Sequence, residues 1–141
     1  MSTRYLTINT EFRKALNALS VTAKSGAVTL SKYYIGDVAP TSGPYLYSWL
    51  LTNEPDGAEL GNDKAELITG IFQIDAYIPA TADYSSNDLV VTDQISTAFY
   101  RGLRLPNNIE ILNVRRGQPV ISGGYIKTTI DVNFRTFQAA G

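Results

Sequence analysis

Two carboxylates on predicted strands are the side chains of this sequence best placed to do acid–base chemistry. Asp75 lies in the stretch GIFQIDAYIPAT (70–81), and Asp131 lies in YIKTTIDVNFRTF (125–137). Two carboxyl groups about 5 to 9.5 Å apart can hydrolyse a glycosidic bond. Nothing in the spacing shows that these two residues are neighbours. A small carboxylate-dependent hydrolase is therefore only an alternative interpretation. The simpler interpretation is that both residues form the polar half of a strand pattern.

Other site chemistry is restricted by composition. The 141-residue chain contains no cysteine and no histidine, which excludes thiolate nucleophiles, Ser-His dyads and Cys- or His-ligated metals. It has neither a P-loop nor a G-x-G-x-x-G motif, and the acidic stretch 54–66 does not match the spacing of an EF-hand. We therefore expect no catalytic residue, no cofactor and no metal. A ligand-binding module built on the nine tyrosines is a further alternative.

Charge is distributed unevenly along the chain. The formal net charge is −1, yet residues 54–93 contain nine acidic residues and one lysine, whereas residues 94–141 sum to +4. The pI of about 5.3 argues against specific nucleic-acid recognition. A solvated surface is one interpretation, and contact between oppositely charged surfaces of different copies is the sharper one. The candidate contact residues are Glu54, Asp56, Glu59, Asp63, Asp75, Arg101, Arg104, Arg115, Arg116, Lys127, Asp131 and Arg135.

Helical periodicity appears twice. Apolar residues at 5, 8, 12, 15, 16 and 19 predict a first helix that is capped by Ser2 or Thr3 and ends before Gly26. A second helix is expected from a cap at 85–87 towards Arg101 and Arg104. Its predicted apolar face consists of Val91, Ile95, Ala98, Phe99 and Gly102.

Five segments have strand patterns: 27–35, 44–52, 70–79, 109–116 and 125–137. In 70–79 the even-numbered side chains are apolar and the odd-numbered ones include Gln73, Asp75 and Tyr77. The polar segment 53–66 is expected to form a long exposed loop or a hairpin tip. The order α-β-β-β-α-β-β predicts one α+β domain over residues 1–141, with two helices packed on one face of a mostly antiparallel sheet.

The sequence as a whole resembles the tail-terminator proteins of long-tailed, siphovirus-like bacteriophages. Four segments carry the resemblance: a first helix ending in ALNALS, then GPYLYSWLL, GIFQIDAYIP and TTIDVNF. Between the last two lies a helix ending in AFYRGLRL, followed by a strand and a glycine turn. The most specific part is FQIDAYIP followed by a helix that contains F-x-R-G.

This resemblance implies a tail-terminator-like fold and a structural, non-enzymatic role. Such proteins form a homo-oligomeric ring, a hexamer, that ends the tail tube, stops its polymerisation and joins the tail to the head. The implied partners are other copies of the chain, the tail-tube protein and head-neck connector proteins, with no membrane. The implied location is the head-proximal end of the virion tail, and the host cytoplasm during assembly. Another neck, tail-completion or tail-tube subunit is the related alternative.

Overall fold

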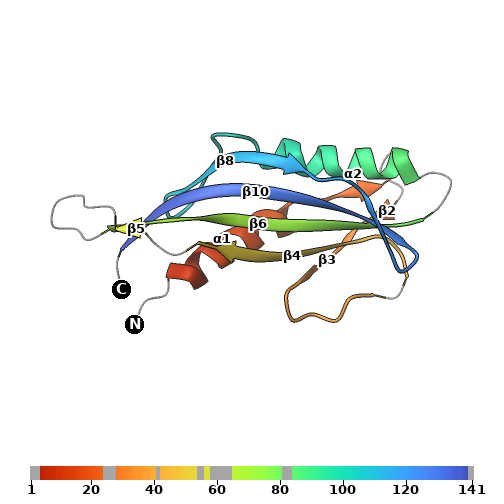
Figure 1. Cartoon of the computed structure of the whole chain (residues 1–141), viewed down its shortest axis with the longest axis horizontal. Helices are drawn as coiled ribbons and strands as arrows, with labels where there is room; N and C mark the ends of the chain where they lie inside the picture. Colours follow the sequence, from red (N-terminus) through yellow and green to blue (C-terminus); the bar gives the residue numbers. More distant parts are fainter. Residues whose placement is uncertain are drawn as a thin grey trace.

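The computed structural model describes residues 4–23, 28–40, 42–53, 56–57, 65–80 and 84–139. It is an α+β fold with two helices and one large, mostly antiparallel sheet, as the sequence predicts (Figure 1). The helices are α1 (Arg4–Ala18) and α2 (Tyr84–Ala98). The large sheet has the order β3-β4-β6-β10-β8-β7, with β5 paired to β6 and β9 paired to β10. Its strands are β3 (Ser31–Tyr34), β4 (Tyr45–Thr52), β5 (Asp56–Gly57), β6 (Ala65–Pro79), β7 (Arg104–Leu105), β8 (Ile109–Arg116), β9 (Val120–Ser122) and β10 (Tyr125–Ala139).

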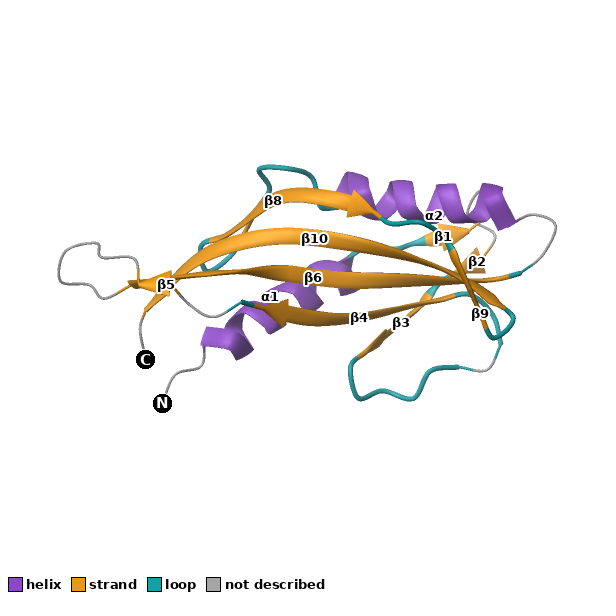
Figure 2. Cartoon of the chain, in the orientation of Figure 1, coloured by secondary structure: helices purple, strands orange, loops and turns teal. Residues whose placement is uncertain are grey.

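Two long antiparallel strands, β6 and β10, form the centre of the sheet (Figure 2). Phe72 of β6 lies opposite Val132 of β10, and Ile74 lies opposite Ile130. All four side chains have no exposed surface. The predicted alternation is therefore confirmed, because the even-numbered residues of both strands face the core. Among the described strand pairs of the large sheet, only β3 and β4 are parallel.

Four phenylalanine rings join the helices to this face of the sheet. The ring of Phe12 in α1 stacks on Phe72, with centroids 4.8 Å apart, and lies 4.9 Å from the ring of Phe134 in β10. Phe99, one residue after α2, lies 6.4 Å from Phe12 and 6.5 Å from Phe72. Since the rings come from α1, β6, β10 and the end of α2, one cluster fixes both helices over the long strands. Figure 1 shows α1 passing behind these strands.

The first helix ends earlier than the sequence predicts. It ends at Ala18, and the chain continues into β1 (Thr22–Ala23), which pairs with β2 (Val28–Thr29). The backbone N–H of Thr22 donates to Oε1 of Gln94 in α2, at 3.0 Å, so a distant helix holds this segment out of α1. Gly26, the predicted end signal, lies outside the described residues.

The second helix is also shorter than predicted. It ends at Ala98, and Gly102 takes a left-handed φ of +88° that a helix does not allow. The N–H of Gly102 donates to the carbonyl of Ile111 at 2.8 Å, which draws this turn onto the edge of β8. Arg101 and Arg104 therefore lie beyond the helix and beside the sheet.

Strand boundaries differ as well. β6 begins at Ala65, within the segment predicted as a loop, and β5 pairs with its first residues. The hairpin interpretation of 53–66 agrees with this pairing for Asp56 and Gly57. The predicted strand 27–35 is divided between β2 and β3, with Leu30 between them bonded to the carbonyl of Val21 at 2.9 Å.

Candidate interaction surface

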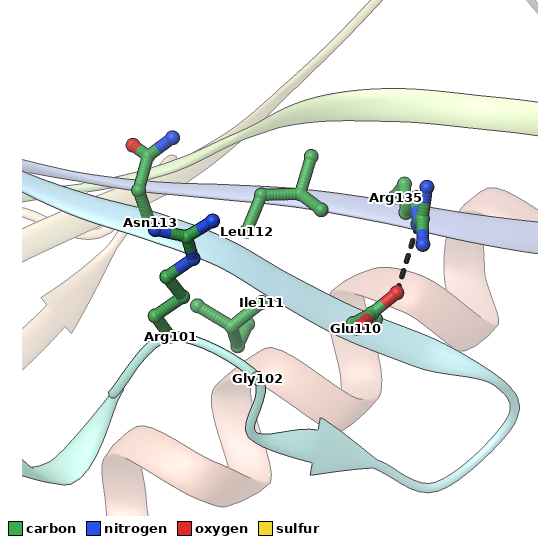
Figure 3. Close-up of a pocket in the computed structure, with 7 residues that line it drawn as sticks. All are labelled: Arg101, Gly102, Glu110, Ile111, Leu112, Asn113 and Arg135. Carbon is green, nitrogen blue, oxygen red and sulfur yellow. Dashed lines mark hydrogen bonds and ion pairs between the residues drawn. The ribbon is translucent and has the colours of Figure 1, made fainter.

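Three arginines line the surface around a single carboxylate, Glu110, where β8 begins. Figure 3 shows Glu110 with two of them, Arg101 and Arg135. Nε of Arg135 donates to Oε1 of Glu110 at 2.8 Å. The guanidinium of Arg104 lies 3.8 Å from the other oxygen of Glu110. Arg101 lies on the opposite side of a cavity of about 480 Å³ that Glu110 and Arg135 also line. This arrangement leaves two positive charges in excess.

A second cavity of about 330 Å³ adjoins the first. It shares Glu110 and Arg135 with it, and it adds Arg104, Asn108 and Phe137 to the lining. The ring of Phe137 is 39% exposed. We call the combined surface the arginine groove and define it by Arg101, Arg104, Glu110, Arg135 and Phe137.

The arginine groove is positioned by cross-strand register. Arg135 of β10 and Arg104 of β7 lie opposite Glu110 from its two sides. The register between β8 and β10 shifts at Leu112, which has no partner in β10. Such a bulge changes the direction in which the neighbouring side chains of β8 point. The side chains of Arg104 and Arg135 remain 71% and 48% exposed. Exposed ion pairs contribute little to folding, so these arginines are available to a partner.

Asp75 has a different environment from the one predicted. It lies on the sheet face away from the helices, between Tyr47 of β4 and Thr129 of β10, with no exposed surface. Its Oδ1 accepts hydrogen bonds from Thr129 at 2.6 Å and from Gln73 at 3.4 Å, whereas its Oδ2 has no partner among the described residues. Burial raises the pKa of Asp75, although Thr129 opposes the shift. Asp75 therefore has no exposed surface in the single chain, and its contact with a neighbouring copy stays a prediction.

The two candidate catalytic carboxylates share this face without forming an open site. Asp131 lies opposite Gln73 and therefore diagonally from Asp75, and its charge contributes to the raised pKa of Asp75. Asp75 has no exposed surface, so this carboxyl group is not open to a substrate in this structure. Within the described part of the chain, no three acidic side chains converge as a metal site would require.

Over residues 8–134 the sequence matches the family described as phage tail terminator protein. The chain belongs to the phage tail terminator family. The resemblance seen in the sequence is thereby confirmed, and the protein is placed among phage tail structural proteins. A solved protein structure with 18% sequence identity superimposes with a TM-score of 0.67 over 100% of this chain and 99% of that one, which shows a shared fold. No curated protein matches the sequence.

In this tail terminator, two adjacent arginines of β8 face opposite sides of the sheet. Arg116 forms an ion pair with Asp88 of α2, whose side chain is 2% exposed, and its Nε donates to Thr92 at 3.2 Å. It therefore attaches the helix to the sheet within the chain. Arg115 is exposed and lies opposite Asp131 on the other face.

The remaining predicted contact residues of the tail terminator fall into two groups. Lys127 is half-buried on the Asp75 face, where its positive charge opposes the rise in the pKa of Asp75 that burial causes. Asp56 lies in β5, and Glu54, Glu59 and Asp63 lie outside the described residues. No helix in the described ranges is long and apolar enough to cross a bilayer.

Glu110 is the member of the arginine groove that the sequence does not reveal. It lies in an ordinary strand pattern, IEILNVRR, and no other charged residue lies between it and Arg115. Its importance comes from strand pairing: β7 directly precedes β8 in the chain, β10 follows later, and the register of both brings Arg104 and Arg135 to it.

Proposed function

We propose that this protein forms a ring at the end of the phage tail tube, stops polymerisation of the tube and presents the surface that joins the tail to the head. The observation that carries the proposal is the match to the phage tail terminator family over residues 8–134. The match covers almost the whole chain, so the complete fold, rather than a short motif, supports the role. The proposed ring is a hexamer, as in the sequence-based expectation.

The shape of the sheet supports assembly in a ring. Its two edges are unlike: β3 forms one edge, and β8 with the short β7 forms the other. A contact between two different surfaces repeats from copy to copy, and it closes into a ring when the rotation allows. The partners in this proposal are further copies of the chain, the tail-tube protein and the head-neck connector proteins.

Electron microscopy of the purified protein, alone and with tail tubes, tests the proposal. We expect discrete rings of constant diameter, and single rings seated at one end of each tube. Extended polymers of the purified protein would instead identify a tube subunit. A neck or tail-completion component would bind heads or finished tails without occupying the tube end.

A phage in which the gene is deleted supplies the functional test. We expect tails of uncontrolled length that do not join to filled heads, and recovery of both properties when the wild-type chain is supplied in trans. Tails of normal length in the deletion would contradict the terminator role.

A further inference from the structure

We propose that the arginine groove binds the acidic segment 54–63 of a neighbouring copy of the chain. This inference rests on the proposed ring and names one contact within it. The groove contributes Arg101, Arg104 and Arg135, and the segment contributes four carboxylates and no basic residue, through Glu54, Asp56, Glu59 and Asp63.

The charges of the groove are not neutralised within the described chain. Among the described residues that line the two cavities, Glu110 is the only acidic one, and it already contacts Arg104 and Arg135. Arg101 is exposed, and among the described residues no carboxylate forms an ion pair with it. A guanidinium presents a planar fork of donors that matches a carboxylate. The groove therefore favours carboxylate groups from outside.

The form of the groove favours a peptide over a nucleic acid. Glu110 lies in the middle of the arginines and would repel a continuous run of phosphates, whereas separate carboxylates can bind on either side of it. Apart from its charged side chains, the larger cavity is lined by Gly102, Ile111, Leu112 and Asn113. Among the described residues no tyrosine, tryptophan or phenylalanine lines the larger cavity, and Phe137 of the smaller one is the single aromatic of the groove that could stack on a base.

The sheet order indicates that the segment comes from another copy. β5, which contains Asp56, pairs with the edge of β6 away from β10, so β6 and β10 lie between β5 and β8. With strands about 4.8 Å apart, three spacings separate β5 from β8 by about 14 Å. Arg104 lies on β7, one strand beyond β8, so the backbone of β5 is still further from this arginine of its own chain.

A reciprocal charge exchange tests the contact. The first variant, Arg101→Glu/Arg104→Glu, reverses the groove, and the second, Glu59→Lys/Asp63→Lys, reverses the segment. Each variant alone should self-associate at least about tenfold more weakly than the wild type in sedimentation equilibrium at low salt, because each now opposes like charges. An equimolar mixture should recover association, since every contact in an alternating ring again joins opposite charges.

Controls separate this contact from a general effect of charge or folding. Lys14→Glu, on the exposed surface of α1, makes the same charge change as Arg101→Glu and should leave association unchanged. The single variant Arg101→Glu alters no ion pair of the described chain, and its thermal unfolding should match that of the wild type.

Several outcomes would overturn the inference. Failure of the mixture to recover association would do so, as would an equal loss in Lys14→Glu. Lower stability of both double variants without recovery in the mixture would instead show that the chain's own segment occupies the groove. Binding of single-stranded DNA that is lost in Arg101→Glu/Arg104→Glu, with self-association intact, would identify a nucleic-acid site.

The same experiment distinguishes failure of this contact from failure of the ring. If both double variants form the same rings as the wild type, the ring proposal stands and the groove contact is overturned. A wild-type chain that forms no ring on tail tubes would overturn the ring proposal. In that case, association of the first variant with the second in excess of either alone would still support the groove contact, and its absence would overturn it.

Discussion

Oγ1 of Thr129 in β10 donates a hydrogen bond of 2.6 Å to Oδ1 of Asp75 in β6. The two residues lie directly opposite each other on the sheet face away from the helices. This bond, with a longer one from Gln73, satisfies one oxygen of a carboxyl group that has no exposed surface. Burial is nevertheless the largest influence, and it raises the pKa of Asp75 above its ordinary value of 3.8.

Asp75→Asn should become more favourable as the pH rises. Because its pKa is raised in the folded chain, folded Asp75 keeps its proton to a higher pH than unfolded Asp75, and its contribution to stability falls as the pH rises from 3.8 towards the folded pKa. The free energy of unfolding of Asp75→Asn minus that of the wild type should therefore increase as the pH rises above 4. Urea unfolding at pH 4, 5.5 and 7 measures this difference, and a value independent of pH would contradict the assignment.

Thr129→Val should destabilise the fold. The replacement preserves shape but removes the donor at 2.6 Å, leaving Asp75 with the longer bond from Gln73. We expect a loss of about 1 to 3 kcal/mol at pH 7, and a smaller loss at pH 4 where the carboxyl group is protonated more often. The same substitution made in Asp75→Asn is the control, because the ionic partner is then absent. Equal losses in both backgrounds would show that the hydroxyl acts through packing alone.

Arg116→Met should weaken the attachment of α2 to the sheet and lower the stability of the fold. The change leaves Asp88, whose side chain is 2% exposed, without its guanidinium partner. Breaking a buried pair costs about 3 to 5 kcal/mol, and because the side chain of Arg116 is 34% exposed we expect about 2 to 3 kcal/mol. The matched control is Arg115→Met, which lies on the other face and should change stability by less than about 0.5 kcal/mol. Equal effects of the two substitutions in denaturant unfolding would refute this role.

Gly70→Ala should be poorly tolerated. A Cβ at this position of β6 would lie 2.3 Å from the carbonyl oxygen of Leu51 and 3.1 Å from Cε1 of Phe134. The sheet would have to shift at its β4 side, and we expect a loss of about 3 kcal/mol or failure to fold. At Gly117, where the nearest atom would be 3.4 Å away, the same substitution should cost less than about 1 kcal/mol. Thermal unfolding of the two variants side by side measures the contrast.

Local periodicity was sufficient for much of the fold. The spacing of Ile8, Phe12 and Leu16 predicted the buried face of α1, and alternation predicted which side chains of β6 and β10 face the core. These patterns work because a helix or a strand repeats over a few residues, so the sequence itself displays the buried side. The segments that carry the family resemblance lie in the same regular elements.

Element ends required the rest of the molecule. α1 and α2 both end before the predicted residue, because Gln94 holds Thr22 and because Gly102 bonds to Ile111. Gln94 is 72 residues from Thr22, and Ile111 belongs to the next long strand rather than to α2. Likewise, the start of β6 is set by pairing with β10 and β5, which hydrophobic alternation within the segment does not report.

The candidate surface was decided by tertiary structure for the same physical reason. The sequence by itself determined that arginines predominate after residue 94 and carboxylates in 54–93, but not which of them meet. Cross-strand register brings Arg135 to Glu110, turns Arg116 towards α2 and places Asp75 beneath its neighbours. A shift of one residue in a strand would exchange the two faces, so the environment of each charge depends on pairings between distant segments. Local sequence patterns determine the helices and strands, and only the register in which the strands pair determines the arginine groove.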